Sequence, residues 1–373
     1  MNSTNPLHSL KQLGQSLWLD DIHRGMLNNG DFKNYIDQDG ISGVTSNPAI
    51  LKNAIVDRDD YDDAIAQLKN TGIDARGAYE KLVIEDLQRA ADLLRPVYDT
   101  TAGVDGYVSM EVSPHYAYDT EETIRAAKRL WELLDRPNIM IKIPATREGI
   151  PAIRSLIAEG MNINITLIFS LSRYRDVAKA YIEGLNDRLK EGKPIDSIAS
   201  VASFFMSRID VLIDKQLDAL ATKDKEKATD IAAIRGNIAI VSAKLAYQHY
   251  KRTFTADTWK PFAEAGAKTQ RLLWASTSTK DPSFSKVKYI DELIAADTVN
   301  TVPQKTIKAY RETGKPELRL ENNLESTIET LSQLAKMGID LGASAQQLED
   351  EGLQKFIKPF DLLLETLKQR LGT

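Results

Sequence analysis

A lysine within an otherwise apolar run is the residue whose type and setting point most clearly to chemistry. Lys142 lies in the run Ile-Met-Ile-Lys-Ile-Pro, residues 139–144, which is typical of a buried β-strand. Because side chains alternate along a strand, Met140, Lys142 and Pro144 face one side and the isoleucines face the other. If the isoleucines pack against helices, Lys142 points inward, where burial favours a neutral amine that can attack a ketone. A lysine that protects an edge strand from aggregation explains the same pattern.

Polar side chains also occur at or near the ends of other β-rich runs. These candidates are Asp20, Asn47, Glu111, Asn164, Thr166 and Ser203. Taken singly they have ordinary explanations, since Asp20 can cap a helix, Asn47 precedes a proline in a turn, and Glu111 can be solvated. If their strands end at one edge, these residues and Lys142 form a polar cavity in an apolar setting.

Eight β-rich runs alternate with amphipathic helical segments along the chain. The runs cover residues 16–20, 41–46, 106–112, 139–144, 163–169, 197–203, 271–276 and 298–303. The helical segments, with apolar residues three and four apart, include residues 79–94, 120–134, 171–189 and 208–221. A strand followed by a helix eight times over predicts an α/β fold, the (β/α)8 TIM barrel, whose active site lies at the carboxyl ends of the strands.

Two additions enlarge this predicted barrel. About two helices of extra chain lie between residues 208 and 269, between strands six and seven, and a helical tail covers about residues 344–373. A doubly wound open sheet has the same alternation, but its usual glycine-rich first turn is missing. Because no linker rich in Pro, Gly or Ser divides the chain, residues 1–373 are predicted to form one barrel domain with a helical tail.

Composition excludes several classes of function. The net charge of -5 gives no reason to expect nucleic acid or a membrane as a partner. There is no apolar run long enough to cross a bilayer and no signal-like start, which predicts a cytoplasmic protein. The chain has no cysteine and only 4 scattered histidines, so thiolate chemistry is excluded and a zinc site is disfavoured. We therefore expect neither a metal nor a cofactor.

At two longer stretches the chain resembles the transaldolases. Residues 43–51, Gly-Val-Thr-Ser-Asn-Pro-Ala-Ile-Leu, are similar to the first signature of that family. Residues 139–150, Ile-Met-Ile-Lys-Ile-Pro-Ala-Thr-Arg-Glu-Gly-Ile, are similar to the second, which contains the Schiff-base lysine. Shorter matches follow in the family's order at residues 16–21, 109–111, 164–170 and 203–208. The resemblance covers about residues 12–340 and is to the longer bacterial and plant-type members.

The resemblance implies a (β/α)8 barrel that transfers a dihydroxyacetone unit between sugar phosphates without a cofactor. In the usual direction, sedoheptulose 7-phosphate and glyceraldehyde 3-phosphate give erythrose 4-phosphate and fructose 6-phosphate, a step of the non-oxidative pentose phosphate pathway. Lys142 would attack the C2 ketone of the donor, and Asp20 would move the proton of the C4 hydroxyl. Glu111, working with Thr166 through a water, would shuttle protons while the Schiff base forms and breaks.

Further residues are implied to bind the substrate or to separate this family from its nearest rival. Asn47, Asn164 and Ser203 are expected to hold the dihydroxyacetone hydroxyls. Relatives that only cleave fructose 6-phosphate tend to carry a tyrosine where this chain has Phe205, and they lack the glutamate matched by Glu111. Both positions favour a transaldolase over a fructose-6-phosphate aldolase.

Basic residues are expected to bind the phosphate group. Arg208 is the first candidate, because a guanidinium binds phosphate through two hydrogen bonds. Family members often have a second arginine after strand seven, whereas this chain offers Lys280, with Lys286 and Lys288 close by. A non-catalytic barrel that binds sugar phosphates and a metal-dependent aldolase are the remaining alternatives. The sequence does not decide between a monomer and a homodimer.

Overall fold

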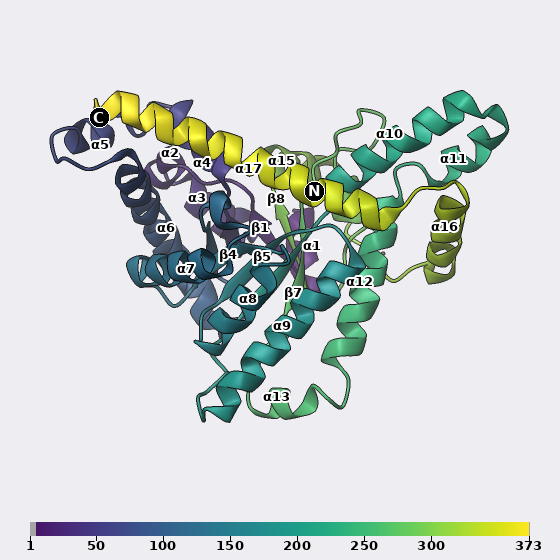
Figure 1. Ribbon diagram of the computed structural model, residues 1–373, viewed down its shortest axis with the longest axis horizontal. Coiled ribbons are helices and arrows are strands. Elements are labelled where there is room, and N and C mark those ends of the chain that lie inside the picture. Colours follow the sequence, from purple (N-terminus) through teal and green to yellow (C-terminus); the bar gives the residue numbers. More distant parts are fainter. Residues whose placement is uncertain (1–4, 373) are drawn as a thin grey trace.

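The protein is a closed barrel of eight parallel strands, paired in the order of the sequence from β1 to β8 and back to β1 (Figure 1). The computed structural model describes residues 5–372. The strands are β1 Gln15–Leu19, β2 Gly43–Thr45, β3 Tyr107–Glu111, β4 Ile139–Pro144, β5 Ile163–Ile168, β6 Ser200–Phe205, β7 Arg271–Ala275 and β8 Thr298–Val302. The predicted (β/α)8 barrel is confirmed, and the open doubly wound sheet is excluded because β8 pairs with β1.

Helices cover the outside of the barrel and connect its strands (Figure 1). Before β4 they are α1 Pro6–Gln12, α2 Arg24–Asn28, α3 Asp31–Asp39, α4 Pro48–Val56, α5 Asp62–Leu68, α6 Ala75–Thr100, the 3₁₀ turn η1 Pro114–Tyr116 and α7 Thr120–Leu134. From β4 to β7 they are α8 Gly149–Ala158, α9 Leu171–Lys190, α10 Ser207–Lys223, the 3₁₀ turn η2 Lys225–Lys227, α11 Ala228–Ile234, α12 Ile238–Phe254 and α13 Lys260–Glu264. The last group is α14 Lys288–Asp291, α15 Gln304–Thr313, α16 Leu324–Lys336 and α17 Leu341–Leu371.

Strand β4 has the side-chain orientation predicted from the alternation of side chains along a strand. It spans the predicted residues, and Ile139, Ile141 and Ile143 are fully buried on its outer face. Burial of each of these side chains stabilises the fold by about 1.5–3 kcal/mol, which helps to fix the register of β4 with its neighbouring strands. The opposite face, which carries Lys142, therefore points into the barrel.

Strand β6 differs from the prediction, which placed it at residues 197–203. The backbone N–H of Ile198 bonds to the carbonyl of Ile195 at 3.3 Å and closes a turn just before the strand. Pairing with β7 instead begins at Val201 and continues to Phe205. Ser203 therefore lies within β6 rather than at its end, and the aromatic pair that follows it belongs to the strand.

The predicted additions are present, with changed boundaries. Between β6 and β7 the chain forms α10, α11, α12 and α13, as expected for extra helices in this interval. The tail begins at Leu341, earlier than expected, because the Asp340 side chain accepts hydrogen bonds from the N–H groups of Gly342 and Ala343 and caps the helix. Figure 1 shows α17, in yellow, crossing the molecule over one end of the barrel. Among the described residues, there is no helix with the length and apolar character needed to cross a membrane.

Candidate active site

A cavity of about 370 Å³ opens at the carboxyl ends of the barrel strands. Its walls include eight of the ten predicted site residues: Asp20, Asn47, Lys142, Thr166, Ser203, Phe205, Arg208 and Lys280. The other two, Glu111 and Asn164, are buried directly behind this wall, where they contact Lys142 and Ser203. The expected gathering of polar strand-end residues around Lys142 is therefore what the fold produces.

Lys142 lies at the bottom of the cavity and is 4 % exposed. Its Nζ donates a hydrogen bond to the carbonyl of Ser46 at 3.1 Å and lies 3.3 Å from Oε2 of Glu111. Strand β4 is hydrogen-bonded on both sides, with Lys142 in register with Glu111 on β3 and Asn164 on β5. The alternative of an edge-strand lysine is therefore wrong, and a buried amine next to a carboxylate remains.

Glu111 and Thr166 are buried polar side chains with unused hydrogen-bonding capacity. Apart from its ion pair with Lys142, the Glu111 carboxylate has no hydrogen-bond partner among the described residues, and neither does the Thr166 hydroxyl. Burial raises the pKa of Glu111 above its ordinary value, although the charge of Lys142 opposes the shift. A carboxyl group with a raised pKa and a free acceptor takes up a proton more readily than an ordinary glutamate, which suits it to proton transfer.

Asp20 stands on another wall of the cavity, directly after β1. Its Oδ1 accepts a hydrogen bond of 2.8 Å from Thr45, whose hydroxyl also lies 2.7 Å from that of Thr301. Burial raises the pKa of Asp20, while the charge of Lys142 and the hydrogen bond from Thr45 act in the opposite direction. Two carboxyl groups with raised pKa values therefore face one lysine.

The three predicted hydroxyl-binding residues are placed differently from one another. Asn164 donates to Ser109 at 3.0 Å and accepts from Ser203 at 2.7 Å, so it links these two serines and orients the Ser203 hydroxyl. Asn47 is the N-cap of α4, and its Oδ1 accepts from the N–H groups of Ala49 and Ile50. Asn47 is therefore a helix cap rather than the turn residue of the ordinary explanation. Its side chain also lines the cavity, and its amide Nδ2 can donate hydrogen bonds.

Arg208, at the start of α10, supplies positive charge at the wall opposite the carboxylates. Its Cζ lies 5.1 Å from the centre of the Phe205 ring, and its buried Nη1 has no hydrogen-bond partner within the described part of the chain. Burial lowers the pKa of this guanidinium, against the attraction of Asp20 and Glu111, but a guanidinium remains charged. A buried, unpaired donor of this kind is suited to bind an anion.

Lys280 lies at the rim of the same cavity and donates to Ser278 at 2.9 Å. Loss of solvation at the rim, followed by the nearby charge of Arg208, lowers the pKa of Lys280. Lys288 is turned away, since its Nζ donates to the carbonyl of Gly236 and lies 3.8 Å from the centre of the Phe284 ring. Of the lysines in this loop, Lys280 is therefore the one placed at the cavity.

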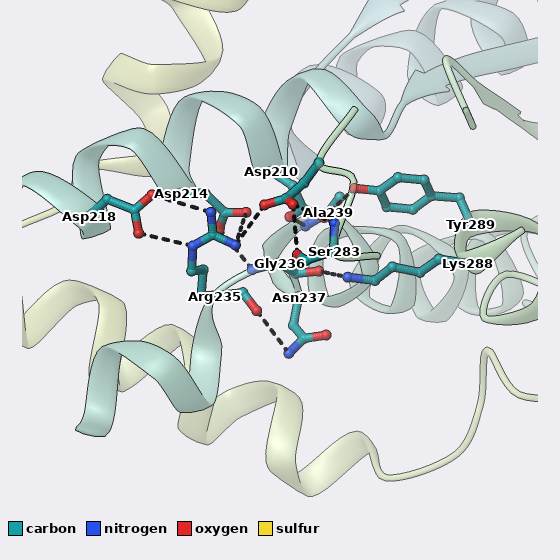
Figure 2. A network of polar contacts seen from close by, with 11 residues as sticks. Asp210, Asp214, Asp218, Arg235, Gly236, Asn237, Ala239, Ser283, Lys288 and Tyr289 are labelled. Atoms are coloured by element: carbon teal, nitrogen blue, oxygen red, sulfur yellow. Dashed lines mark hydrogen bonds and ion pairs between the residues drawn. The ribbon is translucent and has the colours of Figure 1, made fainter. Parts of the chain in front are cut away.

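A network of polar contacts supports the loop that carries Lys280 (Figure 2). Arg235 bonds to Asp281, the next residue in this loop, at 2.9 Å and to Asp218 on α10 at 2.9 Å. Asp210 accepts from the Tyr289 hydroxyl at 2.6 Å and from the N–H of Ala239 at 2.8 Å. These contacts join α10, the start of α12 and the loop after β7 into one support behind the phosphate-binding candidates.

Two residues at the cavity edge have positive φ angles without being glycine. Leu167, with φ 60°, follows Thr166 at an irregularity in the pairing of β5 with β6. Ser276, with φ 55°, follows the last residue of β7 and lines the cavity. Such conformations cost about 1–3 kcal/mol each and are common where a strand end must direct a side chain into a site.

Several cavity residues were not predicted from the sequence. Thr45 lies within the predicted run 41–46, so its orientation toward Asp20 could have been inferred from strand alternation. Arg58 comes from the loop after α4, and Phe356 comes from the tail helix α17, more than two hundred positions after Lys142. Local spacing contains no signal for either residue. In residues 5–372 no group of three or more His, Cys, Asp or Glu side chains is placed to hold a metal ion.

A (β/α)8 barrel with a buried lysine, two carboxyl groups and a basic rim at the carboxyl ends of its strands defines a barrel enzyme for small anionic molecules. Residues 17–367 match the family described as Transaldolase/Fructose-6-phosphate aldolase. The chain belongs to this family and is an enzyme of it.

Curated relatives match over nearly the full length of the chain. "Transaldolase 2" of Nostoc punctiforme is 47% identical, with 99% of this chain and 98% of the relative covered. "Transaldolase 2" of Nostoc sp. is 44% identical, with 98% of each chain covered. "Transaldolase" of Thermobifida fusca is 43% identical, with 99% of each chain covered. The predicted resemblance to transaldolases is thereby confirmed.

Proposed function

We propose that the protein transfers a dihydroxyacetone unit from a ketose phosphate to an aldose phosphate through a Schiff base on Lys142. The observation that carries this proposal is the buried Nζ of Lys142, 3.3 Å from Glu111, in a cavity that Asp20 and Arg208 also line. The donors would be sedoheptulose 7-phosphate or fructose 6-phosphate, and the acceptors glyceraldehyde 3-phosphate or erythrose 4-phosphate. The names of the relatives support a transaldolase rather than an enzyme that only cleaves.

Formation of the Schiff base requires proton transfers next to Lys142. The neutral amine adds to the C2 ketone of the donor, and the resulting carbinolamine loses water to give an iminium ion. Glu111 first takes a proton from the Lys142 ammonium to free the amine and then takes the proton that the nitrogen gives up after addition. It passes both to the former ketone oxygen, which leaves as water, and Thr166 would orient the water between them. The raised pKa of Glu111 supports this double role.

Cleavage of the C3–C4 bond requires a base on the other side of the substrate. Asp20 removes the proton of the C4 hydroxyl, the C3–C4 electron pair moves into the iminium ion, and the aldose phosphate leaves while an enamine stays on Lys142. When a new aldose phosphate arrives, the enamine attacks its aldehyde carbon and Asp20 returns the proton to the new alkoxide. Ser203 and Asn47 would hold the hydroxyls of the enamine between these steps.

Arg208, assisted by Lys280, would bind the phosphate of the donor and then that of the acceptor. The unpaired Nη1 of Arg208 and the location of Lys280 at the cavity rim support this assignment. The hydrophobic ring of Phe205 offers no hydroxyl to assist protonation of the enamine carbon, the step that must precede hydrolysis, which favours transfer over hydrolysis. We further propose that residues 1–373 act as one barrel domain that contains this single active site.

The deciding experiment combines a transfer assay with reductive trapping. Wild-type protein should convert fructose 6-phosphate rapidly only when erythrose 4-phosphate is supplied, and borohydride with fructose 6-phosphate should modify Lys142, as mapped by peptide mass. Lys142→Ala should abolish both transfer and trapping. Lys268→Ala is the matched control, because Lys268 is a half-buried lysine outside the cavity.

Each alternative has its own outcome in this experiment. Strong cleavage of fructose 6-phosphate without acceptor would identify a fructose-6-phosphate aldolase. Binding of the sugar phosphate without trapping would identify a non-catalytic barrel. Near-normal transfer by Lys142→Ala would refute the Schiff-base mechanism altogether.

A further inference from the structure

The tail helix α17 contributes a side chain to the cavity wall. Phe356 is 2 % exposed, and its ring centre lies 5.6 Å from Nζ of Lys142 and 5.8 Å from Cζ of Arg208. The helix crosses the end of the barrel at which the cavity opens (Figure 1). A segment that follows the last strand by many residues therefore reaches the centre of the site.

The guanidinium of Arg208 lies near two aromatic rings from different parts of the fold. Phe205 belongs to β6, with its ring centre 5.1 Å from Cζ, and Phe356 belongs to α17, with its ring centre 5.8 Å away. Since Nη1 of Arg208 has no hydrogen-bond partner among the described residues, attraction between the cation and these rings contributes to orienting the group, together with the charges of Asp20 and Glu111. Removing one ring should leave the guanidinium free to turn.

The close approach of α17 to Arg208 also depends on Gly352, one helical turn before Phe356. A Cβ atom on Gly352 would lie 3.1 Å from Cδ2 of Leu167 and 3.3 Å from Nη1 of Arg208. Contacts this short are tighter than ordinary van der Waals packing, so a larger residue at this position would require the Leu167 and Arg208 side chains to shift by a few tenths of an ångström. The helix therefore presents a bare backbone to Arg208 and, one turn later, an aromatic ring.

Contacts on both sides of Phe356 fix α17 against the barrel. Before it, Glu349 forms an ion pair of 3.2 Å with Arg173 on α9. After it, Asp361 lies 2.6 Å from Nε2 of His115, and the Phe360 ring packs edge-on against Tyr79 at 5.4 Å between ring centres. Because the helix is held at two points, the position of Phe356 is set by the fold and not by a free chain end.

We propose that Phe356 is a positioning residue for Arg208 and that the tail helix thereby takes part in recognising the phosphate group of the substrate. The ring packs against the guanidinium and keeps Arg208 in its place in the cavity wall. This inference rests on the proposed function only for the identity of the anion as a sugar phosphate. Whatever the anion is, loss of the Phe356 ring should weaken its binding by Arg208.

Inorganic phosphate is the probe that tests this inference without any turnover. Titration calorimetry should show that Phe356→Met, which keeps the volume but removes the ring, weakens phosphate binding about three- to tenfold. Phe356→Tyr, which keeps the ring, should bind phosphate nearly as well as wild type. Phe360→Met is the matched control, because Phe360 is a buried phenylalanine one turn further along α17 and faces Tyr79 instead of the cavity.

Kinetics and borohydride trapping distinguish a loss of Arg208 orientation from a general disruption of the active site. With fructose 6-phosphate, Phe356→Met should raise KM far more than it lowers kcat, and borohydride trapping of Lys142 with unphosphorylated dihydroxyacetone should fall less than phosphate binding does. Phosphate binding by Phe356→Met equal to that of wild type, or an equal loss in Phe360→Met, overturns the inference. If Phe356→Met folds less well than Phe360→Met, Phe356→Leu provides a second non-aromatic replacement. A wild-type protein without transfer activity refutes the proposed function, while the phosphate titration still decides the role of Phe356.

Discussion

At the scale of the residue, the site divides proton transfer between two carboxyl groups. Glu111 contacts the lysine directly from behind the cavity wall, whereas Asp20 lines the cavity and is held by Thr45. Both pKa values are raised mainly by burial, and the charge of Lys142 counteracts both shifts. Both groups are buried, but their different neighbours would let Glu111 transfer protons during Schiff-base formation and Asp20 transfer the proton during cleavage of the carbon–carbon bond.

Asp20→Ala should therefore separate the two stages of the reaction. We expect the variant to form the Schiff base, because Glu111 is untouched, but to slow transfer by about 10²–10⁴-fold, because no base accepts the C4 hydroxyl proton. Transfer is measured with fructose 6-phosphate and erythrose 4-phosphate, and Schiff-base formation by borohydride trapping. Asp21→Ala is the comparison, since the Asp21 carboxylate instead accepts a hydrogen bond from Gln304 at 2.8 Å. Normal transfer by Asp20→Ala together with loss in Asp21→Ala would move the role to Asp21.

The individual residues also show how far sequence reasoning reaches. The placement of the lysine, both carboxylates and Arg208 near the cavity could be predicted, because each lies in or next to a predicted strand and within a stretch that resembles the family. The cap formed by Asn47 and the use of Asn164 to orient Ser203 could not, because they depend on which of several hydrogen bonds the fold permits. Phe356 could not be predicted because its partners come from β4 and α10, far away in the sequence.

At the scale of the element, buried acids on α10 support the loop that carries Lys280 (Figure 2). Asp214 is 5 % exposed and accepts from the N–H of Gly236 at 2.8 Å, while Arg235 lies 3.9 Å from its other oxygen. Burial raises its pKa from 3.8 to about 6, and the hydrogen bond from Gly236 limits the shift. The folded protein therefore holds a proton at Asp214 more tightly than the unfolded chain does.

This shift predicts a specific pH dependence of stability. Since the folded pKa lies above the unfolded value, the stability from protonated Asp214 is fully present below about pH 3.8 and is lost as the pH rises through about 6. Asp214→Asn stays neutral and keeps the acceptor for Gly236. Its unfolding free energy relative to wild type should therefore rise by about 1–3 kcal/mol between these pH values, as measured by denaturant unfolding. Asp218→Asn, on the exposed side of the same helix, should show little change over this range. A difference for Asp214→Asn that does not vary with pH would contradict the assignment.

Element boundaries also show why part of the fold was harder to predict. Strand β4 could be predicted to the residue, because it is a short apolar run interrupted only by Lys142 and a proline ends it. The predicted position of β6 was too early in the chain, because Ile198 and Ala199 are apolar and buried but lie at a turn that precedes the strand. Apolar residues indicate burial but not backbone conformation, so a buried segment just before a strand gives the same sequence pattern as the strand itself.

At the scale of the whole molecule, the tail helix is packed as part of the barrel protein. It contacts α4, α6 and α10, and its buried residues recur at three- and four-residue spacing, as in Phe360, Leu363 and Leu367. Gly352 and Phe356 extend this stripe to the active site. A helix that shares one apolar core with the barrel should unfold together with it.

Two neighbouring leucines of α17 test this directly. Leu363 is fully buried, whereas Leu362 is 51% exposed on the other side of the helix. Leu363→Ala should lower the free energy of unfolding by about 2–5 kcal/mol, because it removes buried methyl groups and leaves a cavity. Leu362→Ala should change it by no more than about 0.5 kcal/mol.

The readout must come from the barrel and not from the tail. Of the 4 tryptophans, Trp18 on β1 and Trp274 on β7 are fully buried and none lies on α17, so tryptophan fluorescence reports the unfolding of the barrel and not of the tail. If the chain is one domain, Leu363→Ala shifts the denaturant midpoint of this signal and of the far-ultraviolet circular dichroism by the same amount. If the tail is a separate unit, the fluorescence midpoint stays at its wild-type value while part of the helical signal is lost earlier. In that case the orientation of Arg208 would depend on a helix that can detach from a folded barrel.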